Sequence, residues 1–183
     1  EQLTEEKYGN ILSLDTLKEL APMSKKNNPK NYTFTNFEKA NNNYDYALNE
    51  AYENFKTKVE KNDNSTHKLN IKFERFIQKH DERLTQEGVF KALSDKYGTD
   101  YFYEWSDLDK NLIISQKEND PLAEIRYNEL LGEYHEKIEQ YKFEQLIATE
   151  QIKDNQNIRQ KQGFEYISDF LVGCSEMDQW RYK

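Results

Sequence analysis

Glycine, proline and cysteine are scarce in this sequence, and each shortage limits what the protein can be. Its 183 residues include 6 Gly, 3 Pro and 1 Cys. The glycines never cluster, so no glycine-rich loop is present that could cradle a phosphate group. The lone cysteine, Cys174, excludes an intramolecular disulfide and a cysteine zinc site. A single cysteine also favours a reducing compartment such as the cytoplasm.

Long apolar runs and positive charge are also in short supply. No stretch approaches the roughly 20 apolar residues that a membrane-spanning helix needs, so we expect no membrane span. The 34 Asp and Glu outnumber the 26 Lys and Arg, which gives a net charge of −8. This balance disfavours binding to the phosphates of duplex DNA and favours a protein partner with a basic surface. The chain begins at Glu1 rather than Met, so we expect that a preceding segment, with or without an export signal, was removed.

Aromatic residues are plentiful. The chain contains 13 Tyr, 10 Phe and 2 Trp, although only 36% of it is hydrophobic. These rings must therefore supply much of the core. A chain of this length can bury a sizeable core, and we predict one domain over 1–183.

A long helix over 121–162 is the strongest structural prediction. Asp120 can cap its start, Pro121 is favoured at the first helical position, and Gly163 is a natural stop. One helical face carries apolar residues at alternating spacings of three and four, with a gap at Gln145. These residues are Leu131, Tyr134, Ile138, Tyr141, Ala148 and Ile152.

The length of this helix conflicts with a compact domain. It would span about 60 Å at 1.5 Å per residue, whereas a domain of this size should be roughly 40 Å across. We expect a break at Gly132 or fraying at the polar stretch 153–157, unless the molecule is elongated. The apolar seam over 131–152 also predicts a homodimer formed through a short coiled coil.

The remaining segments predict further helices and one irregular region. Residues 1–12 read as weakly helical and peripheral, a short helix ends at Pro22, and 22–33 reads as a loop or linker. A capping box at Thr35 precedes a helix that runs to about Lys61. The next helices are predicted over 66–84 and 86–97, although alternation at Leu69, Ile71 and Phe73 also fits a strand. Residues 99–119 read as an irregular or hairpin-like aromatic segment, and a last helix follows Gly163 with a docked tail at Trp180. The fold class is therefore all-α, a bundle of about five helices built on one long central helix.

Arg75 and His80 form the sharpest catalytic pattern. On a helix, residues five apart are about 140° apart, so both side chains can just reach one cleft. This Arg-x4-His spacing resembles that of the helical HEPN ribonucleases, although Phe76 stands where the family usually has a polar residue. The resemblance implies that His80 acts as a general base without a metal and that Arg75 stabilises phosphate charge.

Metal and cofactor sites find no support in the sequence. A di-iron bundle needs Glu three residues before His, and none of His67, His80 and His135 has it. The sequence also lacks the Gly-x-Ser-x-Gly turn that carries the nucleophile of many serine hydrolases. We therefore predict neither a metal nor a cofactor.

An aromatic segment followed by acidic residues is the best binding candidate. Tyr and Trp flanked by carboxylates resemble a protein-binding hot spot. The predicted binding residues are Tyr101, Tyr103, Trp105, Asp107 and Asp109. Core packing is the alternative for Trp105 and for its neighbour Phe102.

Charge, size and the missing catalytic constellation favour a non-enzymatic binding protein, while leaving open whether the protein is an enzyme. The specific prediction is a small acidic inhibitor or immunity-type protein that neutralises a basic partner. One alternative is a HEPN-like ribonuclease that uses Arg75 and His80. The other is a structural coiled-coil assembly subunit.

Overall fold

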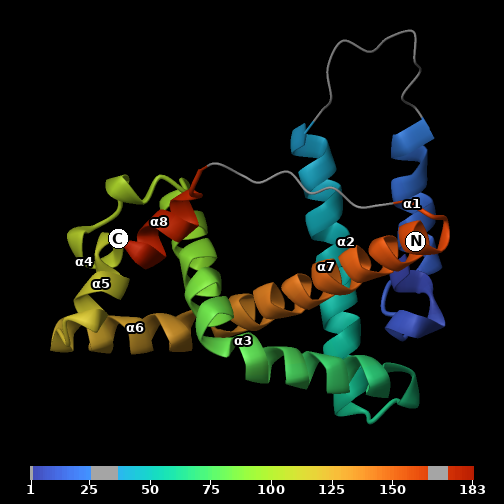
Figure 1. The fold of residues 1–183 in the computed structure, drawn as a ribbon, viewed down its shortest axis with the longest axis horizontal. Coiled ribbons are helices and arrows are strands. Elements are labelled where there is room, and N and C mark those ends of the chain that lie inside the picture. The colour runs from blue at the N-terminus through green and yellow to red at the C-terminus, as the bar shows by residue number, and fades with distance from the viewer. Residues whose placement is uncertain (1, 26–36, 165–172) are drawn as a thin grey trace, which may run out of the picture. The chain divides into compact units, whose positions relative to one another are not determined.

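The computed structural model describes residues 2–25, 37–164 and 173–183, and every regular element in these ranges is a helix (Figure 1). They form eight α-helices and three 3-10 helices. The predicted all-α class, with one long helix, is confirmed. Of the predicted loop or linker, residues 26–33 lie outside the described residues, as do Thr35 of the capping box and most of the last predicted helix.

The chain divides into two compact units, Glu1–Arg75 and Phe76–Lys183. Helix α3, Asn64–Tyr97, includes the boundary between them. The prediction of one domain over 1–183 stays a prediction. Each unit is described by itself below.

The first unit contains two 3-10 helices, η1 (Gln2–Thr4) and η2 (Glu6–Tyr8), followed by α1 (Leu14–Lys25) and α2 (Phe37–Glu60). The start of α3 completes it. Helix α1 continues past Pro22, so the prediction that Pro22 ends this helix is wrong. A proline removes only one N–H from the helical hydrogen bonds, and here the helix tolerates that loss.

The N-terminal segment belongs to the core rather than to the periphery. Leu3, Tyr8 and Ile11 are buried. The carbonyl of Gly9 accepts a hydrogen bond from Nζ of Lys58 (2.7 Å). A Cβ on Gly9 would lie only 2.8 Å from the carbonyl oxygen of Ser65. The segment therefore packs tightly onto the turn between α2 and α3, a tertiary contact that its weak helical pattern did not predict.

Helix α3 is the longest described helix, with 34 residues. It confirms a helix over 66–84 and joins it to the helix predicted over 86–97. Near the expected boundary, Arg83 donates two hydrogen bonds to Glu87 (2.8 and 2.9 Å), one turn further along the helix. Such i,i+4 pairs stabilise a continuous helix.

The second unit contains the rest of α3 and the six helices that follow it in the described residues. These are η4 (Phe102–Glu104), α4 (Asp107–Lys110), α5 (Leu112–Lys117), α6 (Pro121–Glu133), α7 (His135–Lys161) and α8 (Glu176–Tyr182). The aromatic segment is thus irregular and helical rather than a hairpin. Helices α4, α5, α6 and α8 gather around the second part of α3 (Figure 1).

The predicted 121–162 helix is present but interrupted at Tyr134. Asp120 caps its start by accepting a hydrogen bond from the N–H of Leu122 (2.9 Å). The interruption lies two residues after Gly132, the predicted break. The end also follows the prediction, because Gly163 has a φ of +76° just beyond α7.

A single aromatic-rich core fills the second unit. Trp180 of α8 is buried, and its ring centroid lies 5.6 Å from that of Phe90 and 6.1 Å from that of Trp105. The indole N–H of Trp180 donates to the carbonyl of Asp109 (2.9 Å). The predicted docking of Trp180 is confirmed. The fully buried aliphatic members of this core include Val89, Leu93, Leu112, Ile113 and Leu130.

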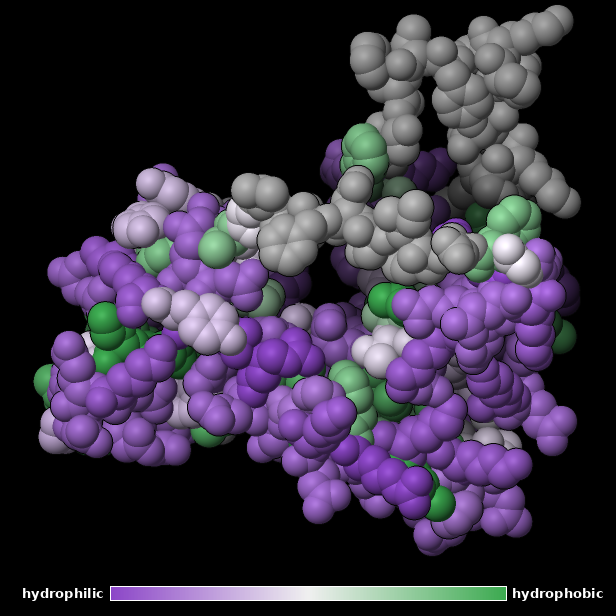
Figure 2. All heavy atoms as spheres, in the orientation of Figure 1, coloured by the Kyte–Doolittle hydropathy of each residue, from purple (hydrophilic) through white to green (hydrophobic). Residues whose placement is uncertain are grey.

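Hydrophilic residues cover most of the face shown in Figure 2, and hydrophobic residues form separate small groups on it. Among the described helices, none combines the length with the apolar composition that crossing a bilayer requires.

Candidate functional site

The aromatic segment after α3 alternates between buried and exposed rings. Phe102 and Trp105 are buried in the core of the second unit. The indole N–H of Trp105 donates to the carbonyl of Thr99 (3.1 Å), and its ring stacks on Tyr97 at 5.5 Å. Because Phe102 and Trp105 are both buried, they hold the short helix η4 in place. Tyr101, before them, and Tyr103, between them, therefore face outward.

Tyr101 and Tyr103 are those outward residues, and we call them the tyrosine pair. Their side chains are 48% and 46% exposed, and their ring centroids lie 5.3 Å apart. Tyr103 also stacks on Phe102 at 4.2 Å, which restricts its ring. Nζ of Lys183 lies 5.2 Å from the Tyr103 centroid, within cation–π range. The pair is thus an ordered aromatic surface open to solvent.

Asp107 supplies an exposed carboxylate shortly after the tyrosine pair. Nζ of Lys110 donates to its Oδ1 (2.7 Å). This hydrogen bond and the positive charge of Lys110 lower the pKa of Asp107. Asp107 is therefore ionised at neutral pH and can accept hydrogen bonds from a ligand.

Asp109 is buried, with an exposed fraction of 1%, and serves the fold. Arg126 donates to both of its oxygens, at 2.8 Å from Nε and 3.2 Å from Nη2. Tyr97 donates through its hydroxyl (2.8 Å) and Lys96 through Nζ (3.2 Å). Burial raises the pKa of Asp109, but the hydrogen bonds from Arg126, Tyr97 and Lys96 outweigh it, so the pKa is lowered.

Glu87 is a second buried carboxylate held by arginine. It accepts hydrogen bonds from Arg83 on its own helix and from Arg181 of α8 (3.0 Å). The hydroxyl of Tyr141 also donates to it (3.1 Å). Burial and the charge of Glu87 raise the pKa of Tyr141. This cluster ties α3, α7 and α8 together.

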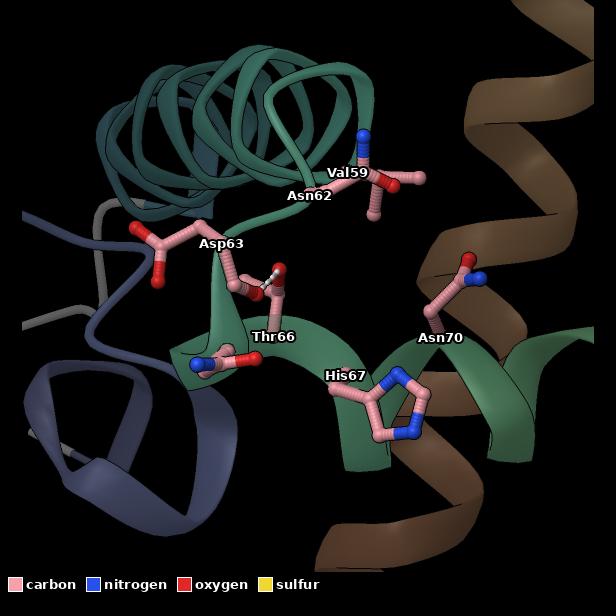
Figure 3. Close-up of a pocket in the computed structure, with 7 residues that line it drawn as sticks. Val59, Asn62, Asp63, Thr66, His67 and Asn70 are labelled. Atoms are coloured by element: carbon pink, nitrogen blue, oxygen red, sulfur yellow. Dashed lines mark hydrogen bonds between the residues drawn. The ribbon is translucent and has the colours of Figure 1, made fainter.

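A polar pocket of about 200 Å³ lies in the first unit, at the turn between α2 and α3 (Figure 3). Val59 and Asn62 line one side, and His67 and Asn70 of α3 line the other. The Asp63 carboxylate points away from His67 and Asn70, and its Oδ1 accepts from the backbone N–H of Ser65 (2.8 Å). We call the pocket the α2–α3 pocket.

The structure separates the predicted site residues. Tyr101, Tyr103 and Asp107 are exposed, whereas Trp105 and Asp109 are in the core. Their role in binding stays a prediction. Arg75 is exposed on α3, and the ring of His80 lies 5.1 Å from that of Phe76. Within the described residues, no three His, Cys, Asp or Glu are grouped so that they could hold a metal ion.

Sequence reasoning missed the α2–α3 pocket. Its only sequence signal is the polar run 62–65, which follows the predicted end of a helix at about Lys61. Asn62 has a φ of +53°, which Asn tolerates better than most residues. Which side chains surround the turn depends on how the two helices pack, and the local sequence does not determine that.

Comparison with known proteins identifies a family. No curated protein and no solved structure matches the chain. Residues 6–183, however, match the family described as 4-alpha-glucanotransferase. This match points to an enzyme, so it contradicts the predicted inhibitor or immunity-type protein and both alternatives, the HEPN-like ribonuclease and the coiled-coil assembly subunit. Because the match covers nearly the whole sequence, the chain belongs to the 4-alpha-glucanotransferase family.

Proposed function

We propose that the protein takes part in the transfer of α-1,4-glucan segments between glucan chains. The family match over residues 6–183 carries this proposal. The transfer breaks one α-1,4-glycosidic bond in a donor and forms another at the 4-hydroxyl of an acceptor. The substrate class is therefore a chain of α-1,4-linked glucose units.

The tyrosine pair supports the proposal as a surface that contacts the glucan. A glucose ring has an apolar face of C–H groups and a rim of hydroxyls. Aromatic rings cover the apolar face with little loss of side-chain entropy, because Tyr has only two rotatable side-chain bonds. Tyr101 and Tyr103 are exposed and 5.3 Å apart, so together they offer more ring surface than either alone.

Asp107, which follows the pair in the sequence, and Lys183, which lies near the ring of Tyr103, suit the hydroxyl rim. Asp107 is an exposed acceptor, and Nζ of Lys183 lies near the ring of Tyr103. Sites that bind small polar ligands combine aromatic surface with a few such polar groups. We therefore assign Tyr101, Tyr103 and Asp107 to glucan contact, with Trp105 as the buried anchor of the segment.

Two of the buried carboxylates, Asp109 and Glu87, are assigned to the fold rather than to acid–base chemistry. A glycosyl-transferring site uses one carboxyl as a general acid, which requires a raised pKa. Asp109 has a lowered pKa because Arg126, Tyr97 and Lys96 hold its charged form. Glu87 accepts hydrogen bonds from two arginines, Arg83 and Arg181, which join helices α3 and α8.

Incubation with maltotriose tests the proposed function. Transfer predicts that maltotriose is redistributed into longer and shorter oligosaccharides, which chromatography resolves. Binding of maltoheptaose without redistribution would assign the chain to glucan recognition within the transfer reaction. If the protein neither redistributes nor binds α-1,4-glucans, the proposal is wrong.

The homodimer through 131–152 stays a prediction, as does a basic protein partner. Ile138, in the middle of that seam, is buried, and it faces Gly88 of α3 in the same unit. Leu131 and Tyr134 pack against the same core. The seam is thus engaged within the chain, and sedimentation of the purified protein tests whether it also associates.

A further inference from the structure

We propose that the α2–α3 pocket binds one glucose unit of an α-glucan, at a site separate from the tyrosine pair. This inference takes its substrate class from the proposed function. It stands on the geometry of the pocket, which belongs entirely to the first unit (Figure 3).

The lining of the pocket excludes several kinds of ligand. No lysine or arginine lines it, so a phosphate or another anion would lack a counter-charge. Its one carboxylate, Asp63, points away from His67 and Asn70 and is engaged by Ser65. Val59 is its one aliphatic side chain, too little for a lipid or an aromatic molecule. The remaining class is a small, neutral and hydroxyl-rich molecule.

Asn62, His67 and Asn70 suit hydroxyl groups in particular. A hydroxyl both donates and accepts a hydrogen bond, and an amide or a neutral imidazole offers both functions within a few ångströms. Asn70 donates through Nδ2 to Glu74 (2.8 Å), which fixes its amide and leaves the amide oxygen as an acceptor. The hydroxyl of Thr66 donates a hydrogen bond to the carbonyl oxygen of Asp63 (3.1 Å), which stabilises the first turn of α3.

The volume fits a single sugar ring. At about 200 Å³ the pocket is smaller than the roughly 300 Å³ at which drug-sized ligand sites begin. Val59 would face the C–H side of the ring, and the amides would face its hydroxyls. Because Asn62 and His67 are exposed, the neighbouring sugars of a glucan can extend into solvent.

Titration of the full chain with maltose, followed in two-dimensional amide NMR spectra, tests this site. We expect saturable shifts at Asn62, His67 and Asn70 with a dissociation constant of about 1 mM or weaker, since few groups are engaged. Sodium phosphate at equal concentration should leave these signals in place. Shifts confined to Tyr101 and Tyr103, no shifts at all, or equal shifts with phosphate would each overturn the proposal.

A pair of matched variants sharpens the test. Asn70→Ala should weaken maltose binding at the pocket about 2- to 10-fold, the effect of one lost hydrogen bond. Asn128→Ala is the control, because Asn128 is likewise a helical asparagine that donates a hydrogen bond to a glutamate one turn away, and it is exposed. Equal affinities of the two variants would contradict the site.

The outcomes separate this inference from the proposed function. Loss of pocket shifts in Asn70→Ala with unchanged redistribution of maltotriose would support the pocket as a subsite outside the transfer step. If the pocket signals do not move while maltotriose is redistributed, the pocket proposal fails and the function stands. If the pocket binds maltose and no redistribution occurs, the pocket stands.

Discussion

Arg126 of α6 donates two hydrogen bonds, of 2.8 Å and 3.2 Å, to the carboxylate of Asp109 of α4 in the second unit. The carbonyl of the same Asp109 accepts the indole N–H of Trp180 from α8. With the hydrogen bonds from Tyr97 and Lys96 of α3, Asp109 therefore links four helices. The sequence predicts a binding role for Asp109; the structure places its side chain in the interior, and the binding role stays a prediction.

Replacing Asp109 should destabilise the protein strongly. Asp109→Asn leaves the partly buried guanidinium of Arg126 without this counter-charge, and losing one partner of a buried ion pair costs about 3–5 kcal/mol. Urea unfolding followed by circular dichroism measures the change. Asp107→Asn is the control, because Asp107 is exposed and water screens its pair with Lys110, so this pair should contribute much less to stability. Similar losses for the two variants would contradict the assignment.

The stability that Asp109 provides should depend on pH in one direction. Its pKa is lowered in the folded protein, so the contribution is complete above the unfolded value of about 3.9 and is lost as pH falls through the folded value. The difference in unfolding free energy between wild type and Asp109→Asn should therefore be constant near neutral pH and shrink below about pH 4. A difference that instead grew with acidification would contradict this account.

Two glycines should respond oppositely to alanine. A Cβ on Gly88 of α3 would lie 3.1 Å from Cγ2 and 3.2 Å from Cα of Ile138 on α7, so Gly88→Ala should destabilise by about 1–3 kcal/mol. A Cβ on Gly132 of α6 would meet nothing within 4 Å. Gly132→Ala should stabilise by up to about 1 kcal/mol, because alanine favours the helix. Thermal unfolding of both variants measures the two changes in stability. If Gly88→Ala stabilised the protein, α3 and α7 would not be in this contact.

Much of the fold follows from the sequence. The apolar spacing of α2, α3 and α7 predicts helices, and Gly132 and Gly163 predict where the long C-terminal run breaks and ends. Local sequence patterns did not predict the structure where contacts between distant segments determine which residues are buried. The burial of Tyr8 depends on Gly9 meeting the α2–α3 turn, and no local spacing encodes that contact.

The site was less predictable than the fold. Alternation of Tyr101 and Tyr103 with Phe102 and Trp105 marked an aromatic surface, and the structure adds which rings are exposed. Net charge led to the wrong function, because the family match points to an enzyme and neither charge nor motif spacing indicated one. Only similarity over the whole chain revealed the family.

The affinity of the full chain for maltoheptaose, measured by isothermal titration calorimetry, shows whether the tyrosine pair binds α-1,4-glucan. We predict binding that falls about tenfold in Tyr103→Ala, equivalent to about 1.4 kcal/mol, and further in Tyr101→Ala/Tyr103→Ala. Tyr46→Ala, at a tyrosine of α2 that is similarly exposed, should bind as the wild type does. Absence of binding by the wild type, or equal binding by the double variant, would contradict glucan recognition by the tyrosine pair.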